Sequence, residues 1–232
     1  DASWRRGSGR SVLSVASGGD LEPLTAPRFN AARRRARAAL IAERATLTLD
    51  AIELTVSDAS TSACVAGVAA YASDVRVRGA HVGSASTGPC RIALAAHEGQ
   101  LSILTSTLIA TDAAVGPGSE HAALFTRGAA EVTVADSELF GIDARVAPLT
   151  AQVRGAFGWV DQSTGQVRIT RTHASPAFGL GASLLAADVA GALDLTGARS
   201  IFVGNSVLQV PGGARSADVL RVVGADSVQL LL

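Results

Sequence analysis

The chain has 232 residues with 20 basic and 20 acidic side chains, and 48% of its residues are hydrophobic although only 4% are aromatic. This length and hydropathy suit one large all-β or solenoid domain and exclude a disordered chain, which needs low hydrophobicity and high net charge. The zero net charge argues against a nucleic-acid partner, and no apolar run reaches the ~20 residues of a membrane span.

Residues 1–43 differ from the rest of the chain, and we expect them to form a degenerate first coil or a capping segment. Residues 11–15 have the pattern of a short strand. Residues 30–45 have two interpretations. They could be the first strand of the next repeat, which is slightly favoured because Arg44 leads directly into a repeat motif. They could also be an amphipathic helix, with Asn30 as its N-cap, that covers the open end of a solenoid.

Charge is distributed unevenly along the chain. Residues 1–44 hold nine Arg and four acidic residues, and four of these Arg lie in the basic cluster at 33–37. A short charge run is usually a solvated face, with an anionic polysaccharide or lipid head group as the alternative partner.

The chain lacks Met and stops in an apolar Leu231-Leu232 pair. We therefore expect it to be a segment of a longer gene product with more coils or a cap.

An eight-residue motif recurs through residues 44–232, with Val132–Leu139 as its fullest form. Its first and third residues are aliphatic, its sixth is usually small, and its eighth is aliphatic or Ala. Copies begin at Leu47, Val75, Leu101, Val132, Val167 and Ile201, and a truncated seventh begins at Val228. The start-to-start spacings are 28, 26, 31, 35, 34 and 27 residues, and a lead-in segment of apolar residues precedes each copy.

The motif indicates two short strands joined by a polar corner, because its apolar residues have a period of two. With the lead-in strand, each repeat forms one coil of three strands. The sequence therefore predicts an all-β fold, a right-handed parallel β-helix of about six to seven coils of 26–35 residues. The facing of the lead-in strand is ambiguous, since Val68 and Leu94 stand one place later in the alignment than Leu124, Trp159 and Leu193.

These repeats resemble those of the pectin-lyase-like superfamily of right-handed parallel β-helices, in particular the secreted β-helix proteins of high-GC bacteria. The resemblance implies a secreted or cell-surface location but does not select among lyases, hydrolases, adhesins and scaffolds. The polygalacturonase motifs are absent, and Arg168-Ile169-Thr170 lacks the Lys of the nearest one. Trp159-Val160-Asp161-Gln162 resembles a lyase motif only weakly.

Cys64 and Cys90 occupy the same repeat position in adjacent coils. Stacking brings such residues about one strand spacing apart, ~4.8 Å, which suits a disulfide. The alternative is a pair of buried free thiols that act as small hydrophobic groups.

The seventh motif position places Glu53 beside His81 and Glu138 beside His173 in stacked coils. These four residues are weak candidates for acid–base catalysis, and the alternative is exposed cross-strand polar pairs. No metal site is expected, because such a site needs three or four converging ligands, and no cofactor motif is present.

Outward positions of the second strands carry a mixture of Arg, hydroxyl and aromatic side chains that resembles a flat glycan-binding surface. The candidate ligand-binding residues at these positions are Arg76, Arg78, Arg168 and Phe202. In the longest coil, Trp159 is a further candidate, together with Phe157, because either ring could stack on a sugar. The alternative is an ordinary solvated sheet face.

Two functions follow. The first is an extracellular or cell-surface structural and interaction module without catalysis, whose partner is a polysaccharide or another surface protein. The second is a polysaccharide lyase or glycoside hydrolase that acts on an anionic polysaccharide, with a groove beside the loops at 109–120 and 140–156. Clustered outward acids on neighbouring coils would favour the enzyme, and the sequence shows none.

Overall fold

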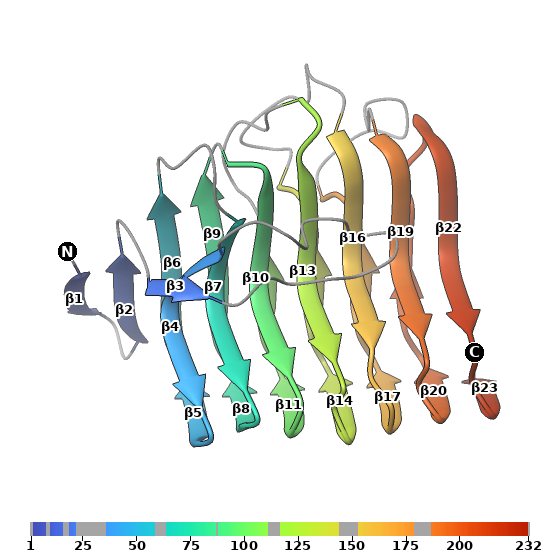
Figure 1. The fold of residues 1–232 in the computed structure, drawn as a ribbon, viewed down its shortest axis with the longest axis horizontal. Helices are drawn as coiled ribbons and strands as arrows, with labels where there is room; N and C mark the ends of the chain where they lie inside the picture. Colours follow the sequence, from blue (N-terminus) through green and yellow to red (C-terminus); the bar gives the residue numbers. More distant parts are fainter. Residues whose placement is uncertain are drawn as a thin grey trace.

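The computed structural model describes residues 2–7, 10–15, 19–21, 36–58, 64–86, 88–110, 117–143, 153–178 and 187–231. The regular structure in these ranges is entirely β-strand, arranged in three sheets that run along one axis (Figure 1). Within each coil the chain passes through the three sheets in turn, so the described chain is a parallel β-solenoid.

Sheet I contains the first strand of each coil, sheet II the second and sheet III the third. The strands of sheet I are β4 (Ala36–Glu43), β7 (Cys64–Tyr71), β10 (Cys90–His97), β13 (Glu120–Arg127), β16 (Val153–Gln162), β19 (Ala187–Thr196) and β22 (Ala214–Val223). Those of sheet II are β5 (Thr46–Asp50), β8 (Asp74–Arg78), β11 (Gln100–Leu104), β14 (Glu131–Ala135), β17 (Gln166–Thr170), β20 (Ser200–Gly204) and β23 (Ser227–Leu231). Those of sheet III are β6 (Ile52–Asp58), β9 (His81–Ser86), β12 (Thr107–Ile109), β15 (Glu138–Phe140), β18 (His173–Ser175) and β21 (Val207–Leu208).

The all-β solenoid predicted from the repeats is confirmed. Strands β7 to β21 form about five interior coils, and β4–β6 and β22–β23 are edge coils, so the count is slightly lower than six to seven. The motif aliphatics pair in register, as in Val75 with Leu101 and Leu101 with Val132, and these residues are buried. Stacked aliphatic columns therefore fill the solenoid interior, which explains the high hydrophobicity with few rings.

The facing of the lead-in strand is now resolved. Val68, Leu94, Leu124, Trp159 and Leu193 pair in one continuous register and belong to the same interior cluster. The offset in the sequence arises at the corner between sheets I and II, which holds one more residue from the coil of β13 onward. An extra residue in a corner does not change which side chains of the lead-in strand face the interior. It does shift an alignment that is counted back from the second strand by one position.

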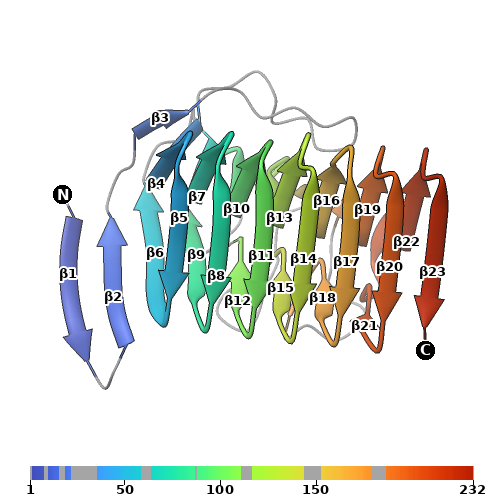
Figure 2. The same ribbon diagram turned by 90° about the horizontal axis from the view of Figure 1, so that it is seen from below.

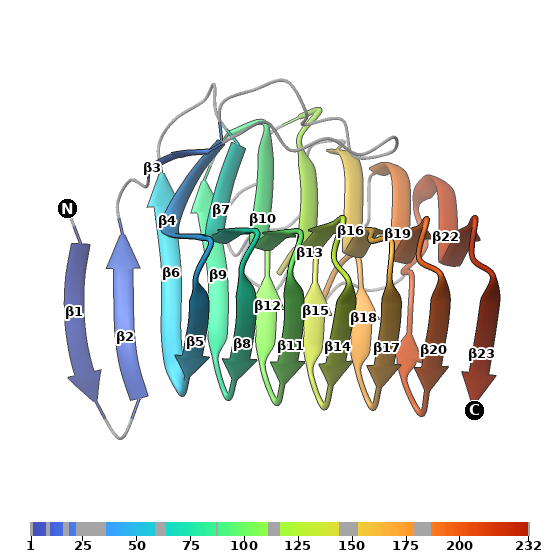
Figure 3. The same cartoon turned by 60° about the horizontal axis from the view of Figure 1, so that its bottom comes forward.

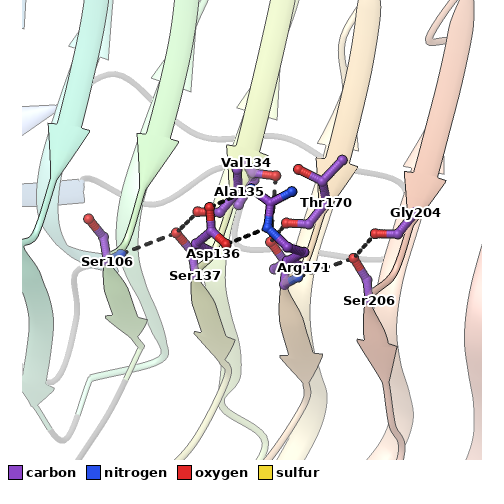
Figure 4. A network of polar contacts seen from close by, with 10 residues as sticks. Ser106, Val134, Ala135, Asp136, Ser137, Thr170, Arg171, Gly204 and Ser206 are labelled. Atoms are coloured by element: carbon purple, nitrogen blue, oxygen red, sulfur yellow. Dashed lines mark hydrogen bonds and ion pairs between the residues drawn. The ribbon is translucent and has the colours of Figure 1, made fainter.

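Each described corner between sheets II and III turns on one residue with positive φ, and in all of them except the first, where Ile52 follows Ala51, the next residue is small (Figure 4). The turning residues are Ala51, Gly79, Thr105, Asp136, Arg171 and Asn205, with φ between 47° and 56°. The hydroxyls of Ser106 and Ser137 each accept a backbone N–H from the preceding coil, at 3.2 and 3.1 Å. Each hydroxyl also donates to the carbonyl two residues earlier, so small hydroxyls close the corner with little volume.

The N-terminal strands lie at the edges of two sheets (Figure 3). β1 (Ala2–Gly7) and β2 (Arg10–Val15) form an antiparallel hairpin, and β2 pairs in parallel with β6, so the strand predicted at 11–15 is confirmed. β3 (Gly19–Leu21) pairs antiparallel with β4. The helix alternative is wrong for Ala36–Glu43, which is strand β4, because its backbone pairs with β7. Asn30 and positions 33–35 of the basic cluster lie outside the described residues.

The predicted disulfide between Cys64 and Cys90 is confirmed. The two residues are register partners on β7 and β10, and their Cα atoms are 4.6 Å apart. Both side chains are buried with Ala66, Ile92 and Phe125 in a second apolar cluster built from sheet I alone. The bond therefore joins two adjacent coils on the face of sheet I that points away from the interior.

Replacing Thr105 with Gly is expected to stabilise the protein by about 0.5–1 kcal/mol. A β-branched residue is strained at its φ of 48°, and this relief exceeds the added entropy of the unfolded chain. Gly79 occupies the equivalent corner of the preceding coil with φ 56°, so Gly79→Ala should destabilise by about 1 kcal/mol. Urea unfolding measures both, and a stability loss in Thr105→Gly would contradict the strain argument.

Removing the disulfide by the double substitution Cys64→Ala and Cys90→Ala should lower the free energy of unfolding by about 3 kcal/mol. The bond closes a loop of 26 residues, which restricts the unfolded chain. Urea unfolding of both proteins measures the difference. Titration of the denatured, unreduced wild type should find no free thiol, and two free thiols would refute the bond.

Candidate functional site

Four of the predicted ligand-binding residues lie on the outer face of sheet II, namely Arg76, Arg78, Arg168 and Phe202. Its strands lie side by side along the solenoid (Figure 2), and their side chains alternate between the interior and solvent. Three parallel rows result. The middle row is Thr48, Arg76, Ser102, Thr133, Arg168, Phe202 and Gln229, in continuous register.

A shallow hollow of about 280 Å³ lies on this face toward its C-terminal end. The polar or aromatic side chains at the hollow are those of Glu131, Gln166, Arg168, Ser200, Phe202, Ser227 and Gln229. They supply two amides, two hydroxyls, one carboxylate, one guanidinium and one ring. Such a set can donate and accept hydrogen bonds and also cover an apolar patch of a ligand.

Arg168 and Phe202 lie side by side in the lining of the hollow. The Cζ atom of Arg168 lies 4.7 Å from the centroid of the Phe202 ring, which is a cation–π distance. A Cβ atom at Gly204 would lie 2.9 Å from the same ring, so the ring packs against bare backbone two residues along its strand. The guanidinium and the glycine together hold the ring in place on the sheet.

The structure thus brings two predicted ligand residues, Arg168 and Phe202, together. Arg76 and Arg78 are exposed on the same sheet but on β8, outside the hollow. The hollow is also lined by the outward residues that directly precede the first aliphatic residue of the repeat motif, such as Gln166 and Ser200. These residues were not identified from the sequence. Strand alternation alone could have identified that row.

The face carries balanced charge. Arg76, Arg78 and Arg168 are matched by the outward acids Asp50, Asp74 and Glu131, all of them exposed. No field of one sign therefore covers the sheet.

The prediction that Trp159 is a surface ligand-binding residue is wrong. Trp159 is fully buried in the solenoid interior, and its Nε1 donates to the Thr126 hydroxyl at 2.8 Å. Phe157 is also fully buried, on the other side of sheet I. Each ring fills a position that smaller side chains occupy in neighbouring coils, so neither can stack on a sugar in solvent.

Asp161 completes a buried polar network around Trp159. Its carboxylate accepts hydrogen bonds from the hydroxyls of Thr126 and Ser163. Burial raises the pKa of Asp161 to about 6, although these hydrogen bonds act in the opposite direction. The network has no access to solvent and is therefore part of the core.

Replacing Asp161 with Asn should stabilise the protein at neutral pH. The folded protein retains the Asp161 proton up to about pH 6, whereas the unfolded chain loses it near 3.8. Wild-type stability should therefore fall as pH rises through this window, by on the order of 2–3 kcal/mol relative to Asp161→Asn. Denaturant unfolding at pH 4 and pH 7.5 measures the difference, with Asp226→Asn as an exposed control. A difference that does not change with pH would contradict the raised pKa.

The Glu and His residues proposed as weak acid–base pairs stack as predicted on sheet III. Glu53 pairs in register with His81, and Glu138 with His173. Glu138 accepts a hydrogen bond from Thr107 Oγ1 at 3.1 Å, and the His173 ring packs edge-on against Phe140. Within the described ranges neither stack forms an ion pair. Register alone therefore does not make a catalytic pair here.

No group of three His, Cys, Asp or Glu side chains among the described residues is placed to hold a metal ion. In the same part of the chain, no helix is long and apolar enough to cross a membrane. The groove was proposed beside residues 109–120 and 140–156, and of these, 111–116 and 144–152 lie outside the described ranges.

The chain matches no protein-family model, and no curated protein or solved structure matches it significantly.

Proposed function

We propose that the chain is a non-catalytic interaction module of the extracellular space or a cell surface, and that the outer face of sheet II binds carbohydrate. The observation that carries this proposal is the hollow around Arg168 and Phe202. Sugars present hydroxyl groups together with apolar C–H faces, and the hollow offers hydrogen-bonding groups beside one fixed ring.

Balanced charge supports a hydroxyl-rich ligand held by hydrogen bonds. Three Arg and three acidic side chains share this face, so a polyanion would meet repulsion as well as attraction. The regular spacing of the strands, ~4.8 Å, gives an extended chain repeated contacts along the middle row. An oligosaccharide longer than the hollow would extend from Phe202 toward Ser102 and Arg76.

Three further observations support parts of the proposal. The Cys64–Cys90 disulfide is consistent with an oxidising compartment, which supports export. The three-strand coil and its repeat motif support membership of the pectin-lyase-like superfamily. The engagement of Glu138 by Thr107 supports an interaction role over acid–base catalysis.

A glycan array followed by calorimetry on the best ligand tests the function. Phe202→Ala and Arg168→Ala should each weaken binding about tenfold or more, because each removes half of the cation–π stack. Thr48→Ala, in the same row at the far end of the sheet, should bind as the wild type does.

Absence of any glycan ligand, or equal affinity in Phe202→Ala, would overturn the proposal. Incubation with uronic-acid polymers provides a second readout. Turnover, seen as new unsaturated or reducing ends, would show that the chain is a lyase or hydrolase acting on an anionic polysaccharide.

A further inference from the structure

Arg91 is a buried charged side chain that forms no ion pair with an acidic side chain of the described residues. It lies on β10, is 0% exposed, and its Nε and Nη2 atoms have no hydrogen-bond partner. Its polar contact among the described residues is from Nη1 to Nε2 of His121, at 3.5 Å. Burial lowers the pKa of Arg91 to about 10, so the guanidinium stays charged at neutral pH.

Over the strands that the structure describes, the row that contains Arg91 supplies no carboxylate, and beyond Val65 it reaches a second guanidinium, that of Arg37. Its register partners on the neighbouring strands are Val65 and His121, and the row continues through Ala156 and Ala190. These two alanines belong to a buried apolar cluster. Glu120 precedes His121 in the sequence, but strand alternation directs its side chain to the opposite face of sheet I. There its carboxylate lies 3.3 Å from Arg154 Nε.

His121 adds a third donor atom without a partner. Its Nε2 lies 2.8 Å from Ser119 Oγ and also faces Arg91 Nη1, which can only donate. This contact assigns Nε2 as the acceptor and places the ring hydrogen on Nδ1, which is buried without a partner. Burial and the charge of Arg91 hold the pKa of His121 well below its ordinary value, so the ring is neutral.

The unfilled groups on this pair are therefore all donors, and they accompany one positive charge. Buried polar groups in folded proteins are almost always hydrogen-bonded, and buried charges are paired. A water molecule could fill a donor but could not balance the charge. We propose that Arg91 and His121 form an internal binding site for a small monovalent inorganic anion of the size of chloride.

This site is separate from the carbohydrate surface. Arg91 and His121 lie on sheet I, whereas the hollow lies on the outer face of sheet II. The anion would stabilise the coils of β10 and β13 by joining their side chains, so its effect should be seen in stability and not in glycan affinity.

Thermal unfolding of the whole chain tests the site, with ionic strength held constant by exchange of sodium gluconate for sodium chloride. The wild-type melting temperature should rise by about 3 °C and saturate, because the anion binds only the folded state. Arg91→Met should lose this increment and be at least as stable as the wild type in gluconate. Arg199→Met, at an exposed corner, should retain the full increment.

The proposal is overturned if the wild type does not respond to chloride, if Arg91→Met keeps the increment, or if Arg199→Met loses it. Should Arg91→Met fail to fold, chloride-35 NMR of the wild type decides the question. Line broadening that added nitrate relieves supports the site, and a line unaffected by the protein refutes it.

Discussion

The in-register stacking of parallel coils is the constraint on which the rest of this molecule depends. Every interior strand exchanges backbone hydrogen bonds with the coil before it and the coil after it, so equivalent residues lie about one strand spacing apart. A position in one coil must therefore fit against the same position in two others. This requirement selects Val, Ile, Leu and Ala for the interior, and it makes each coil depend mainly on its neighbours.

The same constraint explains where polar residues enter the buried regions. At the corners, Ser106 and Ser137 are tolerated because each hydroxyl satisfies backbone groups within its own turn and in the adjacent coil. Among the described residues, Asp161 has hydroxyl partners but no cation, and Arg91 has a His but no carboxylate. Both side chains contrast with the apolar columns that fill most of the interior. Their charges therefore mark the sites where solution conditions should alter stability.

Functional variation is confined by this architecture to the outward rows. Interior positions must match along the axis, but outward positions of sheet II can differ from coil to coil at little cost. The row that changes from Thr48 through Arg76 to Phe202 shows this freedom. On sheet III the same freedom places carboxylates beside histidines, yet Glu138 turns to Thr107. A shared register brings residues near one another, while the local side-chain contacts decide whether they act together.

The sequence by itself determined the solenoid, its inward columns and the pairing of Cys64 with Cys90, because a repeated period-two pattern leaves one consistent way to bury its apolar face. It did not determine which side chains of the lead-in strands face the interior, since an extra corner residue shifts the sequence alignment but leaves the strands in register. Only the tertiary structure decided that Trp159 is internal, that Arg168 and Phe202 stack, and that Arg91 is buried beside His121. These outcomes depend on side-chain volume and on partners some 30 residues away in the chain, which local pattern does not encode.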